Sequence, residues 1–224
     1  MIDWKAIDTV LLDMDGTLLD LHFDNQFWQH FLPARYAEHH QIEPQAALEE
    51  LYQRFDAKRH SIEWYCTDYW SEQLAMDIPA LKQELRHLIA IRPRAIDFLG
   101  YLGVRSIQRV LITNAHRHSL EIKLEETGID QHLDHVFSSH DFGVPKEDIS
   151  FWTKLAQQVD FEPSRTLFID DTETMLESAA AHGIQYLLCI RQPDSSREPR
   201  MDLSFPALDC FGDLLPTKNK HSHG

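Results

Sequence analysis

Two aspartates separated by one residue stand directly after a short apolar run near the start of the chain. Asp13 and Asp15 follow the run 10–12, and Gly16 comes next. In an extended backbone, residues two apart leave on the same side, so the two carboxylates are expected to face one crevice. Glycine at position 16 permits a tight turn that a Cβ atom would obstruct. Two carboxylates placed in this way are able to handle charge in that crevice.

Further groups able to handle charge follow three other short apolar runs. They are Thr113 and Asn114 after 110–112, Lys146 in the loop after 136–137, and Asp170 with Asp171 after 167–169. Ligands of open parallel sheets bind beyond the carboxyl ends of the strands, so these groups are expected to converge. Converging carboxylates repel one another by roughly a few kcal/mol per close pair, and a magnesium ion with oxygen ligands is the simplest remedy.

Each of these residues also has a plainer interpretation. Lys146 alone would be an exposed lysine, and Thr113 alone a turn residue at a strand end. Asp170 and Asp171 could cap the helix that is expected to begin near residue 172. The pair at 13 and 15 is harder to explain as a cap, because a strand of leucines leads directly into it.

The apolar runs predict the elements that position these groups. Runs that are apolar on both faces, here 10–12, 110–112, 136–137, 167–169 and 186–190, are typical of buried parallel strands. Amphipathic segments between them suit crossover helices, one of which should end at Gly183. The sequence therefore predicts an α/β fold with a doubly wound parallel sheet, the Rossmann-like arrangement.

One interval is too long for a loop of such a sheet. About 70 residues separate Asp20 from Arg92, and their patterning is helical, with Pro44 and Pro79 at first-turn positions. We expect residues 1–20 and 92–217 to form an α/β catalytic core and residues 21–91 an inserted, all-helical cap domain. Residues 218–224 are expected to be a disordered polar tail.

The ordered set Asp-x-Asp-Gly-Thr, Thr-Asn, Lys and Asp-Asp resembles the haloacid dehalogenase superfamily of phosphohydrolases, which also carry a helical cap. The resemblance implies that Asp13 attacks phosphorus to form an aspartyl-phosphate and that Asp15 protonates the leaving oxygen. It implies that Thr113 and the backbone near Asn114 bind the phosphoryl group, and that Lys146 neutralises it. A halide leaving group needs no proton, so an aspartate at 15 favours phosphate-ester hydrolysis or mutase chemistry.

The resemblance also implies a magnesium cofactor. Its ligands would be a carboxylate oxygen of Asp13, the backbone carbonyl of Asp15 and one carboxylate of the pair at 170 and 171. We favour Asp171 as the direct ligand and Asp170 as a ligand through water, and the reverse assignment stays open.

The cap must select the substrate. If residues 62–74 form one helix, Cys66, Tyr69, Trp70 and Leu74 share a face that suits the cap core, while Trp64 and Asp68 lie opposite. The candidates for substrate contact are Phe23, Asp24, Trp28, Trp64, Asp68 and His116, with His118 beside the last. An aromatic side chain among them could stack on a nucleobase, although packing within the cap explains aromatic residues equally well.

Several cap strings, among them Glu63-Trp64-Tyr65-Cys66 and Asp68-Tyr69-Trp70-Ser71, resemble a bacterial branch of the superfamily, the GMP/IMP nucleotidases. The resemblance implies a 5′-nucleotidase that hydrolyses purine nucleoside monophosphates. A sugar-phosphate phosphatase or phosphomutase on the same core is the alternative, and a non-catalytic phosphate-ligand sensor is a third.

The amino-acid composition limits the classes of partner that this protein is expected to bind. With 36 acidic and 21 basic residues among 224, the formal charge is −15, which disfavours nucleic-acid polymers and anionic membranes. The three cysteines are odd in number and form no CxxC pair, so we expect a reduced cytoplasmic protein. The resemblance implies that its partner is a small-molecule phosphate monoester, such as a purine mononucleotide. The sequence does not indicate an oligomeric state.

Overall fold

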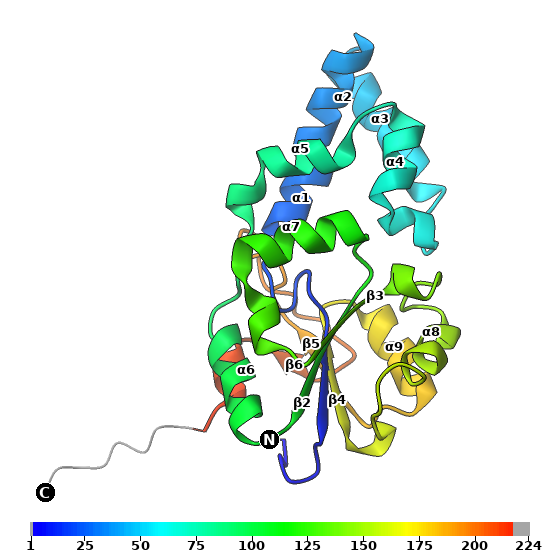
Figure 1. The fold of residues 1–224 in the computed structure, drawn as a ribbon. Coiled ribbons are helices and arrows are strands. Elements are labelled where there is room, and N and C mark those ends of the chain that lie inside the picture. Colours follow the sequence, from blue (N-terminus) through cyan, green and yellow to red (C-terminus); the bar gives the residue numbers. More distant parts are fainter. Residues whose placement is uncertain (1, 217–224) are drawn as a thin grey trace, which may run out of the picture.

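A six-stranded parallel sheet forms the centre of the computed structural model, which describes residues 2–216 (Figure 1). The strand order is β3-β2-β1-β4-β5-β6. The strands are β1 (Thr9–Leu12), β2 (Gln108–Thr113), β3 (His135–Ser138), β4 (Thr166–Asp170), β5 (Tyr186–Ile190) and β6 (Ala207–Leu208). The predicted doubly wound α/β fold and all five predicted strands are confirmed. The tail expected at 218–224 lies outside the described residues.

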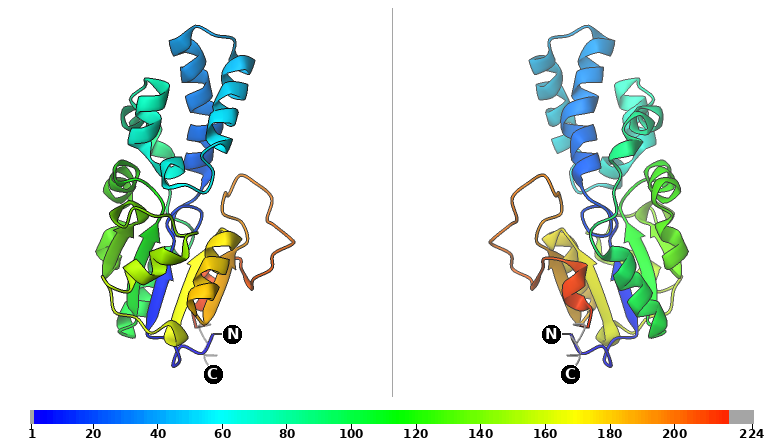
Figure 2. Two further views of the ribbon diagram at one scale, coloured as in Figure 1. Left: turned by 90° about the vertical axis from the view of Figure 1, so that its right-hand side faces the viewer. Right: turned by 90° about the vertical axis from the view of Figure 1, so that its left-hand side faces the viewer.

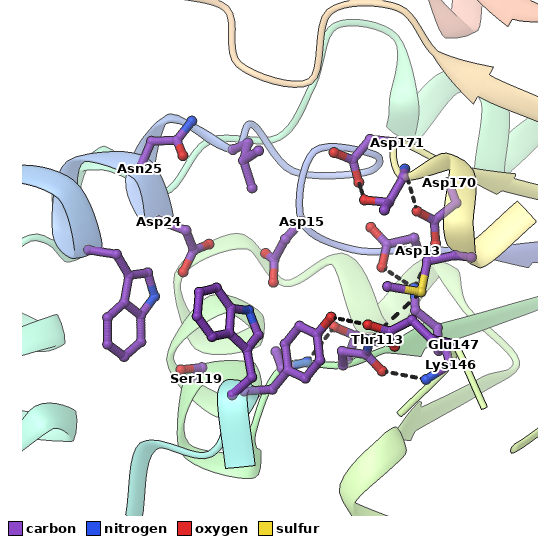
Figure 3. A pocket seen from close by; sticks show the side chains of 18 of the residues that line it. Asp13, Asp15, Asp24, Asn25, Thr113, Ser119, Lys146, Glu147, Asp170 and Asp171 are labelled. Atoms are coloured by element: carbon purple, nitrogen blue, oxygen red, sulfur yellow. Dashed lines mark hydrogen bonds and ion pairs between the residues drawn. The ribbon is translucent and has the colours of Figure 1, made fainter. Parts of the chain in front are cut away.

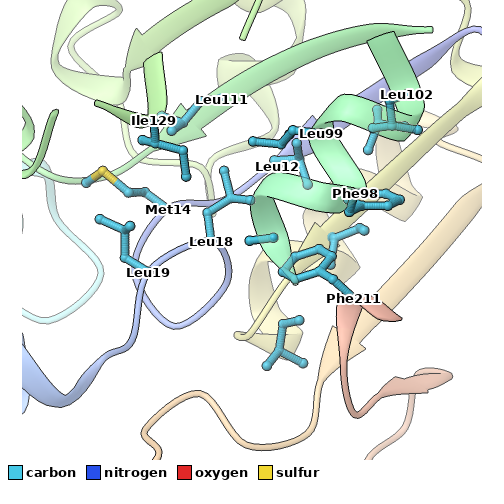
Figure 4. Close-up of a cluster of buried hydrophobic side chains, with 14 of the residues drawn as sticks. Leu12, Met14, Leu18, Leu19, Phe98, Leu99, Leu102, Leu111, Ile129 and Phe211 are labelled. Atoms are coloured by element: carbon cyan, nitrogen blue, oxygen red, sulfur yellow. The ribbon is translucent and has the colours of Figure 1, made fainter. Parts of the chain in front are cut away.

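Helices cover both faces of the sheet (Figures 1 and 2). They are α6 (Ala95–Val104) and α7 (Arg117–Thr127) on one face, and α8 (Ile149–Leu155) and α9 (Glu173–His182) on the other. The alternation of β1 explains the two layers, since Val10 and Leu12 pack in the cluster that contains α6, whereas Leu11 packs in the cluster that contains α8 and α9. Figure 4 shows the first of these clusters around Leu12, Phe98 and Leu111.

Two details of this core bear on the sequence predictions. Helix α9 begins after Thr172 and ends at Gly183, whose φ of 101° is left-handed, as predicted. Strand β6 was not predicted, because two residues carry no readable apolar pattern.

Among residues 2–216, no helix combines the length and the apolar character needed to cross a membrane.

The long interval between β1 and α6 is helical, and residues 21–91 are called the cap below. The cap contains α1 (His22–Gln26), the π-helical turn η1 (Phe27–Phe31), α2 (Leu32–His40), α3 (Pro44–Asp56), the 3₁₀ turn η2 (Ile62–Tyr65), α4 (Thr67–Leu74), α5 (Ile78–Glu84) and the 3₁₀ turn η3 (Arg86–Leu88). Pro44 and Pro79 occupy first-turn positions, as expected. A separate apolar cluster, drawn only from cap residues, forms its interior.

The single helix expected over 62–74 is wrong. The chain leaves helical geometry at Cys66, which has φ −85° and ψ 110° and caps α4 by accepting the Tyr69 N–H at its sulfur. This local capping ends η2 and starts α4 with a new phase. Trp70 and Leu74 are nevertheless buried in the cap cluster, as predicted.

A core segment after β5 holds the base of the cap, and we call residues 192–197 the clasp loop. The Leu21 N–H donates to the Pro193 carbonyl over 3.0 Å, and the Asn25 amide donates to buried Asp194 over 2.6 Å. Arg197 donates to Gln29 over 2.5 Å. The beginning of the cap is therefore fixed to the core by side chains far away in sequence.

Replacing Leu51 by alanine tests whether the cap has its own stabilising interior. Leu51 is fully buried in α3, so Leu51→Ala should lower the free energy of unfolding by about 2–5 kcal/mol in chemical denaturation. Tyr52→Ala is the matched control, because the neighbouring side chain is half exposed and its loss should cost less than about 0.5 kcal/mol. Equal losses for the two variants would contradict this packing.

Candidate active site

The carboxyl ends of β1, β2 and β4 meet at one edge of the sheet, beneath the cap. Asp13 follows β1, and its N–H donates to the Ile169 carbonyl of β4 over 3.0 Å. The buried Lys146 ammonium donates to Asp13 Oδ1 over 2.5 Å and to Asp170 Oδ2 over 2.7 Å. One lysine therefore joins the ends of two adjacent strands, as Figure 3 shows.

Three carboxylates crowd beside this lysine. Oxygens of Asp13, Asp170 and Asp171 lie within 4.8 Å of one another, and Asp13 Oδ2 is buried without a hydrogen-bond partner among residues 2–216. Burial raises the pKa of Asp13 and of Asp171 to about 7 and that of Asp170 to about 6, although Lys146 opposes the rise in each. An unpaired oxygen within an all-oxygen donor set fits a hard divalent cation such as magnesium.

The two aspartates at the end of β4 differ in how many of their carboxylate oxygens accept hydrogen bonds. Asp170 accepts from Lys146 at Oδ2 and from the Thr172 N–H at Oδ1 over 2.8 Å. Within the described residues, the Asp171 carboxylate accepts only the Thr172 hydroxyl, at Oδ1 and over 3.2 Å. Asp171 therefore has the freer oxygen.

Gly16 is required by the way its turn passes Asp171. Its φ is 86°, which side chains disfavour, and an added Cβ would lie 2.8 Å from Asp171 Cγ and 2.9 Å from Pro193 Cβ. The turn after Asp15 therefore packs directly against the carboxylate cluster.

Thr113 and Asn114 end β2 next to these groups. The Thr113 hydroxyl accepts the Ala115 N–H over 3.0 Å. The Asn114 side chain accepts the Lys146 N–H over 2.9 Å and donates to Glu147 over 3.0 Å. Asn114 thus holds the segment that carries Lys146, and Glu147 in turn accepts the Tyr65 hydroxyl of the cap over 2.6 Å.

A series of ion pairs links Asp15 to the cap. Lys123 of α7 donates to Asp15 over 2.6 Å and to Asp24 of α1 over 2.7 Å, and Lys82 of α5 donates to Asp24 over 2.8 Å. Burial alone would raise the pKa of Asp24, but Lys123 and Lys82 hold it well below its usual range. Burial also raises the pKa of Asp15, with Lys123 opposing the rise.

Sequence reasoning missed Lys82 and Lys123. Each follows buried residues on its own helix, Ile78 before Lys82 and both Ser119 and Leu120 before Lys123, at spacings of three or four. A lysine inside an apolar stripe is the signal that could have identified them, because lysines are almost never fully buried unless they are paired.

A cavity of about 510 Å³ connects these groups with the interior of the cap. Asp13, Asp15, Lys146 and the pair at 170 and 171 line one part of it. Aromatic side chains of the cap line another, namely Trp28, Phe55, Trp64, Tyr65 and Trp70. Phe55 and Trp70 are buried, whereas Trp28 and Trp64 are only partly buried, so these two keep surface that a ligand can contact.

The substrate-contact candidates divide into two groups. Asp24, Trp28 and Trp64 line the cavity, and so do Thr113 and Asn114. Phe23 does not line it, because its ring is buried beneath the ammonium groups of Lys82 and Lys123 at 5.0 and 5.4 Å.

Asp68 and His116 also lie outside the residues that line the cavity. They face each other where the cap meets the core, with 3.7 Å between Asp68 Oδ2 and His116 Nε2. His118 Nε2 lies 3.4 Å from the same carboxylate, so this group sits at the surface of the contact between cap and core.

Comparisons with known proteins agree with this arrangement. Residues 7–183 match the haloacid dehalogenase-like hydrolase family. The chain is 45% identical to GMP/IMP nucleotidase YrfG of Escherichia coli (strain K12), over 96% of this chain and 97% of that protein. A HAD phosphatase from Thermococcus onnurineus has the same fold, with a TM-score of 0.76 and 18% identity over 93% of this chain and 96% of that one. YfnB of Bacillus subtilis, solved with magnesium bound, gives a TM-score of 0.63 and 19% identity over 93% and 96% of the two chains. Because the family match includes every acidic and basic group described at the sheet edge, this chain belongs to the haloacid dehalogenase-like hydrolases.

Proposed function

We propose that this hydrolase removes phosphate from purine nucleoside 5′-monophosphates, GMP and IMP among them, and releases nucleoside and inorganic phosphate. The observation that carries the proposal is one cavity that joins Asp13 and Lys146 to Trp28 and Trp64. A phosphate ester with a flat, aromatic leaving group has complementary chemistry at both ends. The relative that is 45% identical and is named a GMP/IMP nucleotidase supports the same substrate class.

Asp13 is the proposed nucleophile. One of its carboxylate oxygens attacks phosphorus, and the bond from phosphorus to the nucleoside 5′ oxygen breaks. Lys146 and Thr113 stabilise negative charge on the phosphoryl oxygens as the bond transfers. Asp15, whose pKa is raised by burial, donates its proton to the leaving oxygen, so the nucleoside departs as an alcohol.

The second half of the reaction regenerates both aspartates. Asp15, now a carboxylate, accepts a proton from a water molecule whose oxygen attacks phosphorus. The bond between phosphorus and Asp13 breaks, and inorganic phosphate is released. Asp15 is protonated again and Asp13 is again a carboxylate.

Magnesium is the proposed cofactor, held by Asp13, the Asp15 backbone carbonyl and Asp171, with Asp170 acting through water. The engagement of both Asp170 oxygens supports this order of the two residues. When bound, the ion would withdraw charge from the phosphoryl oxygens and offset the repulsion among the carboxylates.

Lys123 is the proposed positioning residue for Asp15. Its ammonium contacts Asp15 and Asp24 but not the acids at 13, 170 and 171, so it acts on the proton-transfer group alone. Because Asp24 belongs to the cap, the orientation of Asp15 depends on the cap being in place.

The division of the chain supports the same proposal. We assign residues 21–91 to a substrate-selecting cap and residues 1–20 with 92–217 to the catalytic core, supported by the separate apolar cluster of the cap. We also assign the reaction to the cytoplasm, where the three free cysteines are in keeping with a reducing compartment.

Replacing Asp13 by asparagine tests the reaction. Asp13→Asn keeps the shape but removes the nucleophilic carboxylate, so phosphate release from GMP should fall at least about a thousandfold. Asp130→Asn, at an exposed position, should retain full activity. EDTA should abolish activity of the unmodified enzyme, and added magnesium should restore it. Full activity of Asp13→Asn, or in EDTA, would overturn the proposal.

Replacing Lys123 by glutamine tests the role of its ion pairs with Asp15 and Asp24. The 5′ oxygen of a nucleoside needs a proton to leave, whereas the nitrophenolate of p-nitrophenyl phosphate needs little help. Lys123→Gln should therefore lower kcat/KM for GMP at least about tenfold more than for p-nitrophenyl phosphate. Lys82→Gln, which removes a contact to Asp24 but none to Asp15, is the matched control. If Lys123 had only a structural role, each variant would lower kcat/KM for GMP and for p-nitrophenyl phosphate by the same factor.

Replacing Trp64 by alanine tests base recognition. Stacking of a base on an aromatic side chain contributes about 1–3 kcal/mol, so Trp64→Ala should lower kcat/KM for GMP by about 5- to 150-fold. For ribose 5-phosphate, which has the sugar and phosphate without the base, kcat/KM should fall much less. If both substrates lose activity equally, Trp64 only packs within the cap, and if ribose 5-phosphate is the better substrate of the unmodified enzyme, a sugar-phosphate phosphatase is the better assignment.

A further inference from the structure

A second set of metal-ligating side chains lies apart from the carboxylate cluster, at the contact between cap and core. We propose that Cys66, His116 and His140 bind a zinc ion that fastens the cap to the core and slows turnover. Cys66 belongs to the cap, His116 directly precedes α7, and His140 lies in the 3₁₀ turn η5 (Ser139–Asp141) after β3. None of them lines the active-site cavity.

The geometry brings the three ligand atoms together. The Cys66 sulfur and one ring nitrogen of each histidine lie within 4.8 Å of one another. The rings of His116 and His140 are perpendicular, with centroids 4.8 Å apart. Zinc takes sulfur at about 2.3 Å and nitrogen at about 2.0–2.1 Å, so small side-chain rotations would close the set around one ion.

The two histidines are prepared for coordination. His140 Nε2 is buried and has no hydrogen-bond partner within residues 2–216. Burial, with His116 nearby, lowers the pKa of His140 to about 4, so its ring is neutral near pH 7 and keeps a lone pair. His116 Nδ1 lies 2.7 Å from the Thr67 hydroxyl, a contact of the kind that orients a ligating imidazole.

The donor set selects the metal. A thiolate with two imidazoles suits zinc, whereas magnesium prefers oxygen and fits the carboxylate cluster instead. The Cys66 sulfur, which accepts the Tyr69 N–H at the start of α4, would supply the thiolate of this donor set. Asp68, beside His116 and His118, supplies a carboxylate on the exposed side of the set.

The position of the set predicts its effect. Cys66 belongs to the cap, while His116 and His140 belong to the core, so an ion bound to all three would oppose separation of the two parts. Release of a product enclosed between cap and core requires such separation, and lid opening often limits turnover. Zinc at this site should therefore lower kcat without competing with the nucleotide.

Cobalt(II) is the probe for this site, because it replaces zinc and gives a near-ultraviolet charge-transfer band when a thiolate binds it. The full-length enzyme, stripped with EDTA, is titrated with cobalt in excess magnesium, which occupies the carboxylate cluster. We expect the thiolate band in the unmodified protein and in Cys210→Ser, the matched control at another partly buried cysteine. We expect no band in Cys66→Ser and at least about tenfold weaker cobalt binding in His140→Gln.

The same variants separate this inference from the proposed nucleotidase activity. Zinc displacement of cobalt is read from the spectrum without any substrate, and circular dichroism confirms that each variant is folded. With excess magnesium, micromolar zinc should lower kcat severalfold in the unmodified enzyme and have no such effect in Cys66→Ser. Absence of the thiolate band, or the same band in Cys66→Ser, would overturn the site, whatever the enzyme hydrolyses.

Discussion

The interaction on which the site depends is the pairing of buried ammonium groups with crowded carboxylates. Lys82, Lys123 and Lys146 are each at most 2% exposed, and each donates to at least one aspartate. An unpaired ammonium in such surroundings would cost several kcal/mol, so each lysine requires its partners. With Asp15 protonated, as the proposed mechanism requires, the four carboxylates at 13, 24, 170 and 171 exceed the three ammonium groups by one negative charge, and one divalent cation would make the site positive. The acidic chain can thus accept an anionic substrate.

The ion pairs of Lys146 and those of Lys123 have different roles in the site. Lys146 joins β1 to β4 and belongs wholly to the core, so the phosphoryl end is assembled by the sheet itself. Lys123 joins Asp15 to Asp24 and so connects the core to the cap. The proposed nucleophile, Asp13, is therefore positioned by rigid strands, whereas the proposed proton donor, Asp15, is positioned by a contact between two parts of the molecule. Under the proposed mechanism, proton transfer is in this way tied to enclosure of the substrate.

The sequence was most informative where a regular backbone determines position. Parallel pairing in register brings the ends of β1, β2 and β4 together, so Asp13, Thr113 and Asp170 could be placed in one crevice from their order alone. The contact between Lys123 and Asp15 could not be predicted in this way. The two residues are 108 apart in sequence and meet through packing of α7, which no local pattern encodes. The break at Cys66 was also missed, since one capping contact by sulfur outweighs a continuous helical periodicity. Phe23 shows a further limit, because an aromatic residue beside the catalytic motif can serve as a floor for ammonium groups rather than as a ligand contact.

The clasp loop limits how this enzyme can be recombined with its relatives. Asn25 and Gln29, which line the cavity on the cap side, are held in place by Asp194 and Arg197 of the core. A chimera in which only residues 21–91 of this chain are placed on another family member's core would lose Asp194 and Arg197 and leave the amides of Asn25 and Gln29 misoriented toward the ligand. Transplanting substrate preference between such enzymes therefore calls for two segments, the inserted helices and residues 192–197, exchanged together as one module.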